Sequence, residues 1–192
     1  MTRKNRSTHA PDAGGWLPKP VASGSWQPWL EEAGSLTARI VARCPAAAPF
    51  SVRVLAHGHG LPHGDECVLI GVAAHRLARR RDVLLMSGAT PVVYAHTVVP
   101  QDSLRRAWQL MDRVGSRALG SVLFADPRVI RGPLSFRRLD HRHPLYREAI
   151  GWCPAGMATP VALWARRAVF RLSGQPLLVT EVFLPSILLL RP

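Results

Sequence analysis

Alternating apolar and polar residues predict two β-hairpins of the same design. The first runs from Arg80 to Pro100 and the second from Leu163 to Pro185. In each, a pair of arginines accompanies the first strand, a Ser-Gly pair forms the turn, and prolines bound the second strand. β-Branched and aromatic runs joined by a short turn are typical of hairpins. Two such hairpins indicate one antiparallel sheet, in which a terminal proline closes each outgoing strand.

One ionisable residue interrupts the apolar face of the second hairpin. Side chains alternate along a strand, so four residues of the outgoing strand share one face. These are Leu177, Val179, Glu181 and Phe183. A carboxylate in such a row costs free energy unless it is paired, protonated or used. When the hairpins are superimposed, Glu181 corresponds to His96, so we expect both outgoing strands to carry a polar group at the same height.

The remaining patterns predict short helices around the sheet. Helices are expected at 29–32, 35–43, 101–111, 118–124 and 145–149, with a strand at 50–55 and loops at 57–67 and 126–144. Strands and helices do not alternate regularly, which excludes a doubly wound fold. We therefore predict an α+β fold with a single antiparallel sheet of about six strands and helices packed on it.

Composition and length indicate one folded domain. The chain has 192 residues, of which 47% are hydrophobic, enough for a single core. Residues 1–25 are rich in Pro, Gly, Ser and basic residues and predict a flexible basic arm, which leaves 26–192 as the domain. The arm has no apolar stretch of the kind found in secretory signals, and no apolar run approaches the ~20 residues of a membrane span. Three cysteines without a paired spacing suggest reduced thiols, so we expect a cytoplasmic protein.

The net charge of +13 indicates what kind of partner the protein binds. Such a charge favours polyanions or anionic small molecules. The basic residues are scattered along the chain, without the interleaved aromatic residues of a single-strand-binding surface. Nucleic acid binding therefore stays an alternative, and an arginine-rich solvated surface explains part of the charge.

The loop at 57–67 contains candidate metal ligands. His57, His59, His63 and Cys67 lie close together in it, and such tracts bind zinc in some proteins. Structural zinc sites usually use two separated ligand pairs, however, and the loop's Gly and Pro residues serve ordinary turns. We therefore predict no metal ligands in this loop.

Several motifs resemble those of bacterial chorismate pyruvate-lyases. The run 171–185 resembles the closing motif of that family, and 97–100 and 119–124 resemble two further motifs in the same order. The resemblance covers roughly 29–185. It implies an enclosed ligand cavity and the removal of pyruvate from chorismate to leave 4-hydroxybenzoate, a precursor of ubiquinone. It further implies a monomer that needs no cofactor and no metal.

The resemblance also implies roles for two charged residues. Arg81 matches the arginine that holds the ring carboxylate, and a planar guanidinium grips a carboxylate with two parallel hydrogen bonds. Without the resemblance, Arg81 would be part of a solvated charge run at 79–81. Glu181 matches the glutamate that faces the para oxygen, at the end of the ring where the ether bond breaks. Apolar neighbours that raise its pKa would suit proton donation. From the residues alone, an ion pair of Glu181 with Arg166 or Arg167 is an equal alternative.

Two leucines and one histidine complete the predicted site. Leu36 and Leu119 match family positions that contact the ligand mainly through the backbone, although each alone would be a core residue. Where some family members carry Arg before the motif at 97–100, this chain has His96. We therefore expect either His96 or an arginine in 166–171 to bind the second carboxylate of the substrate.

Two other functions remain open from the sequence. A related sheet fold serves as the effector-binding module of some transcription regulators, which place a winged-helix domain ahead of it. The 25 residues before the predicted domain are too few for such a domain. A basic RNA-binding protein is the other alternative, and strong salt-dependent binding without lyase activity would favour it.

Overall fold

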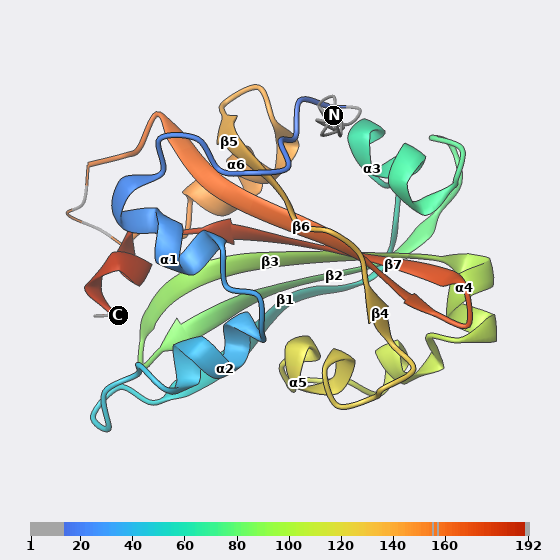
Figure 1. Cartoon of the computed structure of the whole chain (residues 1–192), viewed down its shortest axis with the longest axis horizontal. Helices are drawn as coiled ribbons and strands as arrows, with labels where there is room; N and C mark the ends of the chain where they lie inside the picture. The colour runs from blue at the N-terminus through green and yellow to red at the C-terminus, as the bar shows by residue number, and fades with distance from the viewer. Residues whose placement is uncertain (1–13, 155, 157, 191–192) are drawn as a thin grey trace, which may run out of the picture.

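The computed structural model describes residues 14–154, 156 and 158–190, and these form one antiparallel sheet with helices on both faces (Figure 1). The order of the strands is β1-β2-β3-β7-β6-β4, and β5 also pairs with β6. The strands are β1 (Phe50–Gly60), β2 (Ala78–Ser87), β3 (Thr90–Pro100), β4 (Ile130–Arg131), β5 (Ser135–Asp140), β6 (Ala162–Leu172) and β7 (Gln175–Phe183). The α+β prediction is confirmed, with seven strands instead of about six.

Both predicted hairpins are present and lie side by side at the centre of the sheet. β2 and β3 form the first, β6 and β7 the second, and β3 pairs with β7 to join them. The second turn carries Ser173 at φ 50° and Gly174 at φ 77°, the left-handed pair that suits the twist of a hairpin. Ala95 lies opposite Glu181, and His96 lies opposite Thr180. His96 and Glu181 are thus at nearly the same height, but they point to opposite faces because side chains alternate along a strand.

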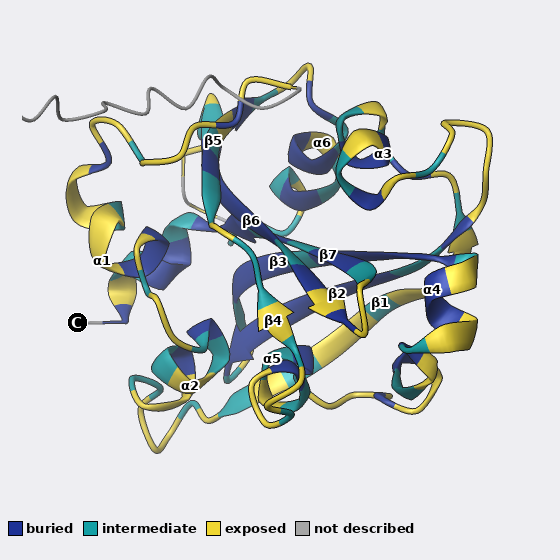
Figure 2. Cartoon of the chain, turned by 45° about the vertical axis from the view of Figure 1, so that its right-hand side comes forward, coloured by how far each residue is buried: buried dark blue, intermediate teal, exposed yellow. Residues whose placement is uncertain are grey.

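Helices cover the two faces of the sheet (Figures 1 and 2). On one face lie α1 (Gln27–Leu30), α2 (Leu36–Val41) and α5 (Leu119–Leu123), and on the other lie α3 (Gly64–Ile70) and α6 (Pro144–Ile150). At one end of the sheet α4 (Gln101–Arg106) follows β3. Short 3₁₀ turns η1 (Gly24–Trp26), η2 (Gln109–Asp112) and η3 (Pro185–Leu189) complete the elements. The central strands are therefore buried on both sides, which explains their nearly continuous apolar sequences.

The predictions of single helices and strands are wrong in two situations: where a strand has a polar sequence, and where a buried residue interrupts a helix. β1 continues to Gly60, and α3 begins at Gly64, where a loop was predicted. The helix predicted at 101–111 is split into α4 and η2, because Trp108 turns into the core and its Nε1 donates to the carbonyl of Gln175 at 3.0 Å. The predicted connection at 126–144 contains β4 and β5, whose arginines gave no strand pattern.

The folded domain begins earlier than predicted. Trp16 is 1% exposed, its Nε1 donates to Asp65, and its ring lies 4.1 Å from the guanidinium of Arg167. Leu17 forms an antiparallel bridge with Phe136 of β5. The prediction of a flexible arm over 1–25 is therefore wrong for residues 14–25, because a tryptophan among turn residues anchors them. Residues 1–13 of that arm lie outside the described part of the chain.

Candidate functional site

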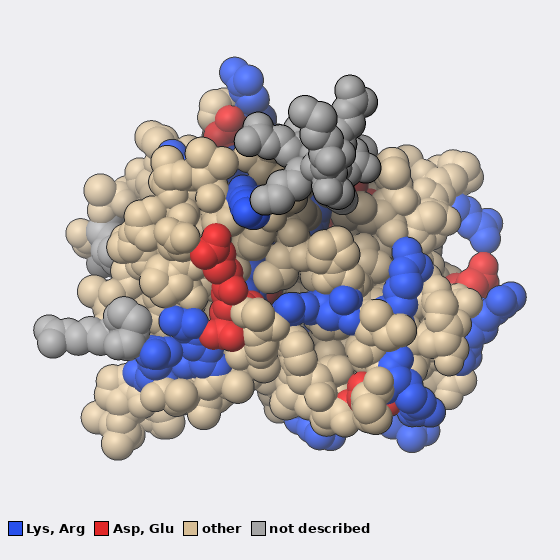
Figure 3. Space-filling model, viewed as in Figure 1, with Lys and Arg blue, Asp and Glu red and all other residues tan. Residues whose placement is uncertain are grey.

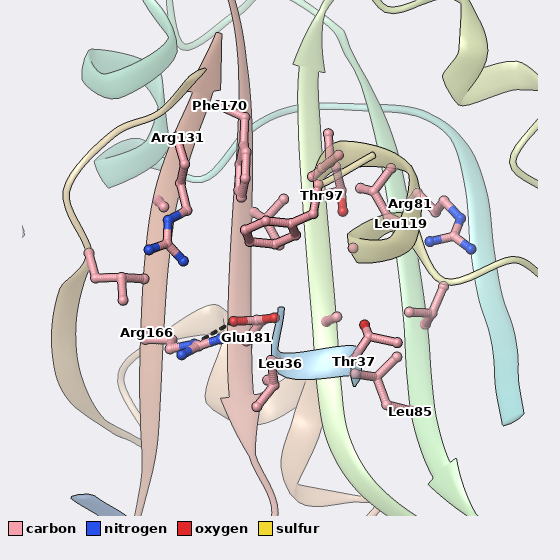
Figure 4. A pocket seen from close by; sticks show the side chains of 18 residues that line it. Leu36, Thr37, Arg81, Leu85, Thr97, Leu119, Arg131, Arg166, Phe170 and Glu181 are labelled. Atoms are coloured by element: carbon pink, nitrogen blue, oxygen red, sulfur yellow. Dashed lines mark hydrogen bonds and ion pairs between the residues drawn. The ribbon is translucent and has the colours of Figure 1, made fainter. Parts of the chain in front are cut away.

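A pocket lies between the sheet and the helices α2 and α5 (Figure 4). Its floor is the face of β2, β3, β7 and β6 that carries the odd-numbered residues of the first three strands. α2 and α5 cover it, and β4 closes one side. Most of the lining is apolar, and the polar side chains in it are Thr37, Arg81, Thr97, Arg131, Arg166 and Glu181. An apolar pocket with a few convergent polar groups is the usual form of a small-molecule site.

All four residues predicted for the site line this one pocket. They are Leu36, Arg81, Leu119 and Glu181. Arg81 lies opposite Thr97 across β2–β3, while Glu181 lies opposite Ala95 across β3–β7. Two strand spacings sideways and two residues along the strand place their Cα atoms roughly 12 Å apart. The two charged side chains thus line the same pocket from different strands, with the guanidinium of Arg81 turned to the side away from Glu181 (Figure 4).

Arg81 is a buried cation that is held by backbone carbonyls. It is 2% exposed, and its Nη2 donates to the carbonyls of Gly115 and Arg117, each at 2.9 Å. Its Nε has no hydrogen-bond partner, and among the described residues no carboxylate forms an ion pair with it. Burial lowers the pKa of the guanidinium from its ordinary value. A buried guanidinium in this state is suited to an anionic ligand.

Glu181 forms an ion pair with Arg166 at the other side of the pocket. Nε of Arg166 donates to Oε2 of Glu181 at 2.6 Å. Nη1 of Arg166 is directed at the end of α1, where it donates to the carbonyls of Leu30 and Glu32 at 3.1 Å and 2.9 Å. Such carbonyls lack partners within the helix. Arg166 therefore fixes the position of Glu181. The ion pair with Arg166, one of the two alternatives for Glu181, is present, and Glu181 also lines the pocket.

Sequence reasoning missed Arg131, which enters the pocket from β4 above Glu181 and Arg166 (Figure 4). Its guanidinium lies 5.6 Å from the ring centroid of Phe124, and in the described part of the chain no carboxylate forms an ion pair with it. Burial, together with the nearby charge of Arg166, lowers the pKa of Arg131. Arg131 lies in a stretch that was predicted as a loop, so the sequence pattern around it did not indicate a binding residue.

Leu36 and Leu119 are the first residues of the two covering helices. Leu36 follows Ser35, whose Oγ caps α2 by accepting from the backbone N–H of Ala38. Both leucines are buried, at 2% and 6% exposure, and both face the pocket. They form an apolar roof above the charged groups.

His96 does not belong to this pocket. It lies on the opposite face of β3, is fully buried, and its ring contacts Asp82 and Glu66. Burial alone would lower the pKa of His96, but Glu66 and Asp82 outweigh this effect and raise it to about 9. Of the groups considered for the second carboxylate, the structure brings Arg166 to the pocket and turns His96 away from it.

Fold and pocket together define an α+β domain with a pocket suited to a small anionic molecule. The fold resembles that of effector domains of transcription regulators. The ligand-binding domain of a protein assigned to the GntR family from Bordetella bronchiseptica superimposes with a TM-score of 0.50 at 14% identity, over 71% of this chain and 84% of that one. PhnF from Mycobacterium smegmatis gives a TM-score of 0.51 at 13% identity, over 81% and 66%. At such identities the likeness shows the fold alone.

The sequence itself matches a family of enzymes. The family model described as "Chorismate lyase" matches residues 16–190. A "Probable chorismate pyruvate-lyase" of Aromatoleum aromaticum is 47% identical over 176 residues, covering 90% of this chain and 93% of its own. The protein of the same name from Azoarcus sp. is 46% identical over 187 residues, covering 94% and 95%. The chain belongs to the chorismate lyase family.

Proposed function

We propose that this protein is a chorismate pyruvate-lyase, a carbon–oxygen lyase that converts chorismate into 4-hydroxybenzoate and pyruvate. The single observation that supports this most is the pocket itself: the buried Arg81 and the half-buried Arg131, both without carboxylate partners among the described residues, line a space that also holds Glu181. Chorismate is a dianion built on one ring, and its two carboxylates match two such cations.

The substrate would lie across β3 with its ring beneath Leu36 and Leu119. Arg81 would bind the ring carboxylate through the N–H donors that are not used in its hydrogen bonds to Gly115 and Arg117. Arg131 would hold the carboxylate of the enolpyruvyl group, since it approaches from the Glu181 side of the pocket. Arg166 supports that assignment by holding Glu181 and not a ligand. The apolar roof excludes water, which strengthens each charge interaction.

The reaction is an elimination within one bound molecule. The bond between the ring carbon and the ether oxygen breaks, and hydrogen leaves the neighbouring ring carbon that bears the hydroxyl. The ring then becomes aromatic, and the departing enol takes up a proton as pyruvate. Glu181 would hydrogen-bond the para hydroxyl beside the breaking bond and orient it. Because aromatisation supplies the driving force, the protein has mainly to position the dianion and stabilise the leaving group.

The test is to incubate the purified protein with chorismate and to follow both products. We expect 4-hydroxybenzoate and pyruvate in equal amounts. Replacing Glu181 by Gln or by Ala should lower turnover by about a hundredfold or more, the range of lost general acid–base or polar assistance. Glu31→Gln, at an exposed carboxylate of the loop after α1, is the matched control and should retain full turnover.

Two results would contradict the proposal. If a demonstrably folded protein forms neither product, the lyase assignment fails, and binding of 4-hydroxybenzoate without turnover would favour a sensor. Normal turnover in Glu181→Ala would remove Glu181 from the mechanism while leaving the activity in place.

The wider setting of the enzyme follows from the same proposal. Its product would supply ubiquinone synthesis in the cytoplasm, and we infer a monomer that works without a cofactor. In the described ranges, no helix combines the length and apolar character that crossing a membrane requires. On the face seen in Figure 3, Lys and Arg are spread out with Asp and Glu among them, so the positive charge on this face is not gathered into one patch of the kind that binds nucleic acid.

A further inference from the structure

On the face of the sheet away from the pocket, three side chains converge with unpaired atoms. His63 precedes α3, Glu66 lies in its first turn, and His96 lies on β3. One potential ligand atom from each of the three residues lies within 4.8 Å of those of the other two, and Nε2 of His96 lies 3.2 Å from Oε1 of Glu66. Nε2 of His63, Oε1 of Glu66 and Nε2 of His96 have no hydrogen-bond partner in the described part of the chain, although Glu66 is 1% exposed and His96 is fully buried. Buried polar atoms are rarely left unpaired, so this arrangement indicates a missing common partner.

The other polar atoms of Glu66 and His96 are held in place. Nδ1 of His96 is hydrogen-bonded to Asp82, its direct neighbour across β2–β3. Oε2 of Glu66 accepts from the backbone N–H of His63 at 2.8 Å. The free atom of each side chain is therefore the one that points to the cluster. A carboxylate behind a histidine ring is the usual support of a metal ligand, because it fixes the ring and leaves the other nitrogen available.

The spacing of these atoms matches coordination better than a hydrogen bond. Nε2 of His96 and Oε1 of Glu66 are 3.2 Å apart in a geometry that makes no hydrogen bond. Ligands at about 2.0–2.1 Å from a tetrahedral ion lie about 3.3 Å apart. Two imidazole nitrogens and one carboxylate oxygen form a donor set that suits zinc. We propose that His63, Glu66 and His96 bind one zinc ion.

A neighbouring group of three residues is a weaker candidate. Asp82, His96 and Glu148 also bring ligand atoms together. Their atoms are already used, however, since Asp82 is bonded to His96 and Oε2 of Glu148 accepts from the hydroxyl of Tyr94 at 2.7 Å. Oε1 of Glu148 lies 3.7 Å from Nε2 of His63. The guanidinium of Arg80 lies 3.5 Å from that same oxygen and partly compensates it.

The zinc would act as a structural cross-link and not in catalysis. It would tie the start of α3 to the central strand β3, on the face opposite the chorismate pocket. The side chains of His63 and Glu148 are 13% and 34% exposed, which provides a route of entry from solvent. Of the loop residues considered from the sequence, the site uses His63 alone. Cys67 is turned to the carbonyl of His63, and His57 and His59 are exposed on β1.

The test is zinc binding by the full chain without an affinity tag, after removal of metal with a chelator. Calorimetric titration with Zn²⁺ should show one ion per chain, and Co²⁺ should give the visible absorption of tetrahedral coordination. Glu66→Gln should weaken binding by about a hundredfold or more, and Asp82→Asn, which leaves all three ligands, by about 10–100-fold. His59→Gln, at an exposed histidine, should bind zinc as the wild type does.

The wild-type titration decides the matter even if a variant folds poorly. A dissociation constant weaker than about 100 μM for the stripped, folded wild type would overturn the proposal. Equal binding by Glu66→Gln and wild type would overturn it too, because the zinc would then sit on surface histidines. In either case the ion pairs of His96 with Asp82 and Glu66 hold this cluster together.

Discussion

Arg81 is the residue on which the site depends. A guanidinium that is 2% exposed and faces no carboxylate among the described residues is costly to bury. The carbonyls of Gly115 and Arg117 satisfy one nitrogen, and Nε is left without a hydrogen-bond partner among the described residues. A ligand carboxylate would pair with this guanidinium, so binding would add the ion pair that Arg81 lacks among the described residues of the free protein.

Replacement of Arg81 by Lys tests that argument. Lysine keeps the charge but loses the planar fork, so we expect kcat/KM for chorismate to fall by about 30-fold or more, in the range for a broken buried charge pair. Steady-state kinetics measures the effect. Arg79→Lys is the control, since Arg79 lies two residues earlier on the same strand and pairs with Asp112. Equal kinetics for Arg81→Lys and wild type would remove Arg81 from the carboxylate site.

At the scale of elements, the contact between α2 and α5 closes the pocket. Gly120 of α5 lies against the start of α2: a Cβ there would lie 2.9 Å from Oγ1 of Thr37 and 3.3 Å from Oγ of Ser35. Ser35 is the cap of α2, so the two helices meet where one of them begins. Only a residue without a side chain allows this approach, and the roof of the pocket depends on it.

Gly120→Ala should therefore push the two helices apart. We expect a severalfold increase in KM for chorismate and a lower melting temperature, because the roof no longer packs on the ring and the Ser35 cap is disturbed. Gly151→Ala is the matched control, because its Cβ would meet nothing within 4 Å and its backbone is helical. A Gly120→Ala variant with normal KM would show that the α2–α5 contact does not form part of the binding site.

The strands that carry the site were predictable, and the elements around them were less so. Period-two alternation identifies both central hairpins and places Glu181 among apolar neighbours. It cannot reveal that His96 turns to the other face, because that depends on the register between β3 and β7. β4 is two residues long and sits in arginine-rich sequence, so Arg131 gave no signal. The cluster at His63 and His96 joins residues from separate elements, and no local pattern shows such a meeting.

At the scale of the whole molecule, the N-terminal segment is part of the fold. Trp16 packs in the core with Leu139 and Leu145 and covers the guanidinium of Arg167, which is 2% exposed. Its indole N–H also donates to Asp65, at the start of α3. One aromatic side chain therefore connects the chain's first described residues to β6, α3 and α6.

Trp16→Ala should destabilise the whole domain. Loss of a fully buried tryptophan typically costs about 3–5 kcal/mol, which corresponds to a fall in melting temperature of roughly 6–20 °C for a chain of this size. Thermal unfolding followed by circular dichroism measures it. Leu17→Ala, at a residue that is 38% exposed, should change the melting temperature by a few degrees at most. A loss for Trp16→Ala no larger than that of Leu17→Ala would mean that the segment is a passive cover.

The outermost strand β1 has a consequence for encounters between copies of the protein. Its register with β2 shifts between Val54 and Ala56, and its exposed positions include Arg53, His57 and His59. An irregular border that carries the charge of Arg53 offers a poor template for a strand from another molecule, because the register shift interrupts the ladder of hydrogen bonds. The sheet can therefore remain open along this side at high concentration without recruiting a second sheet.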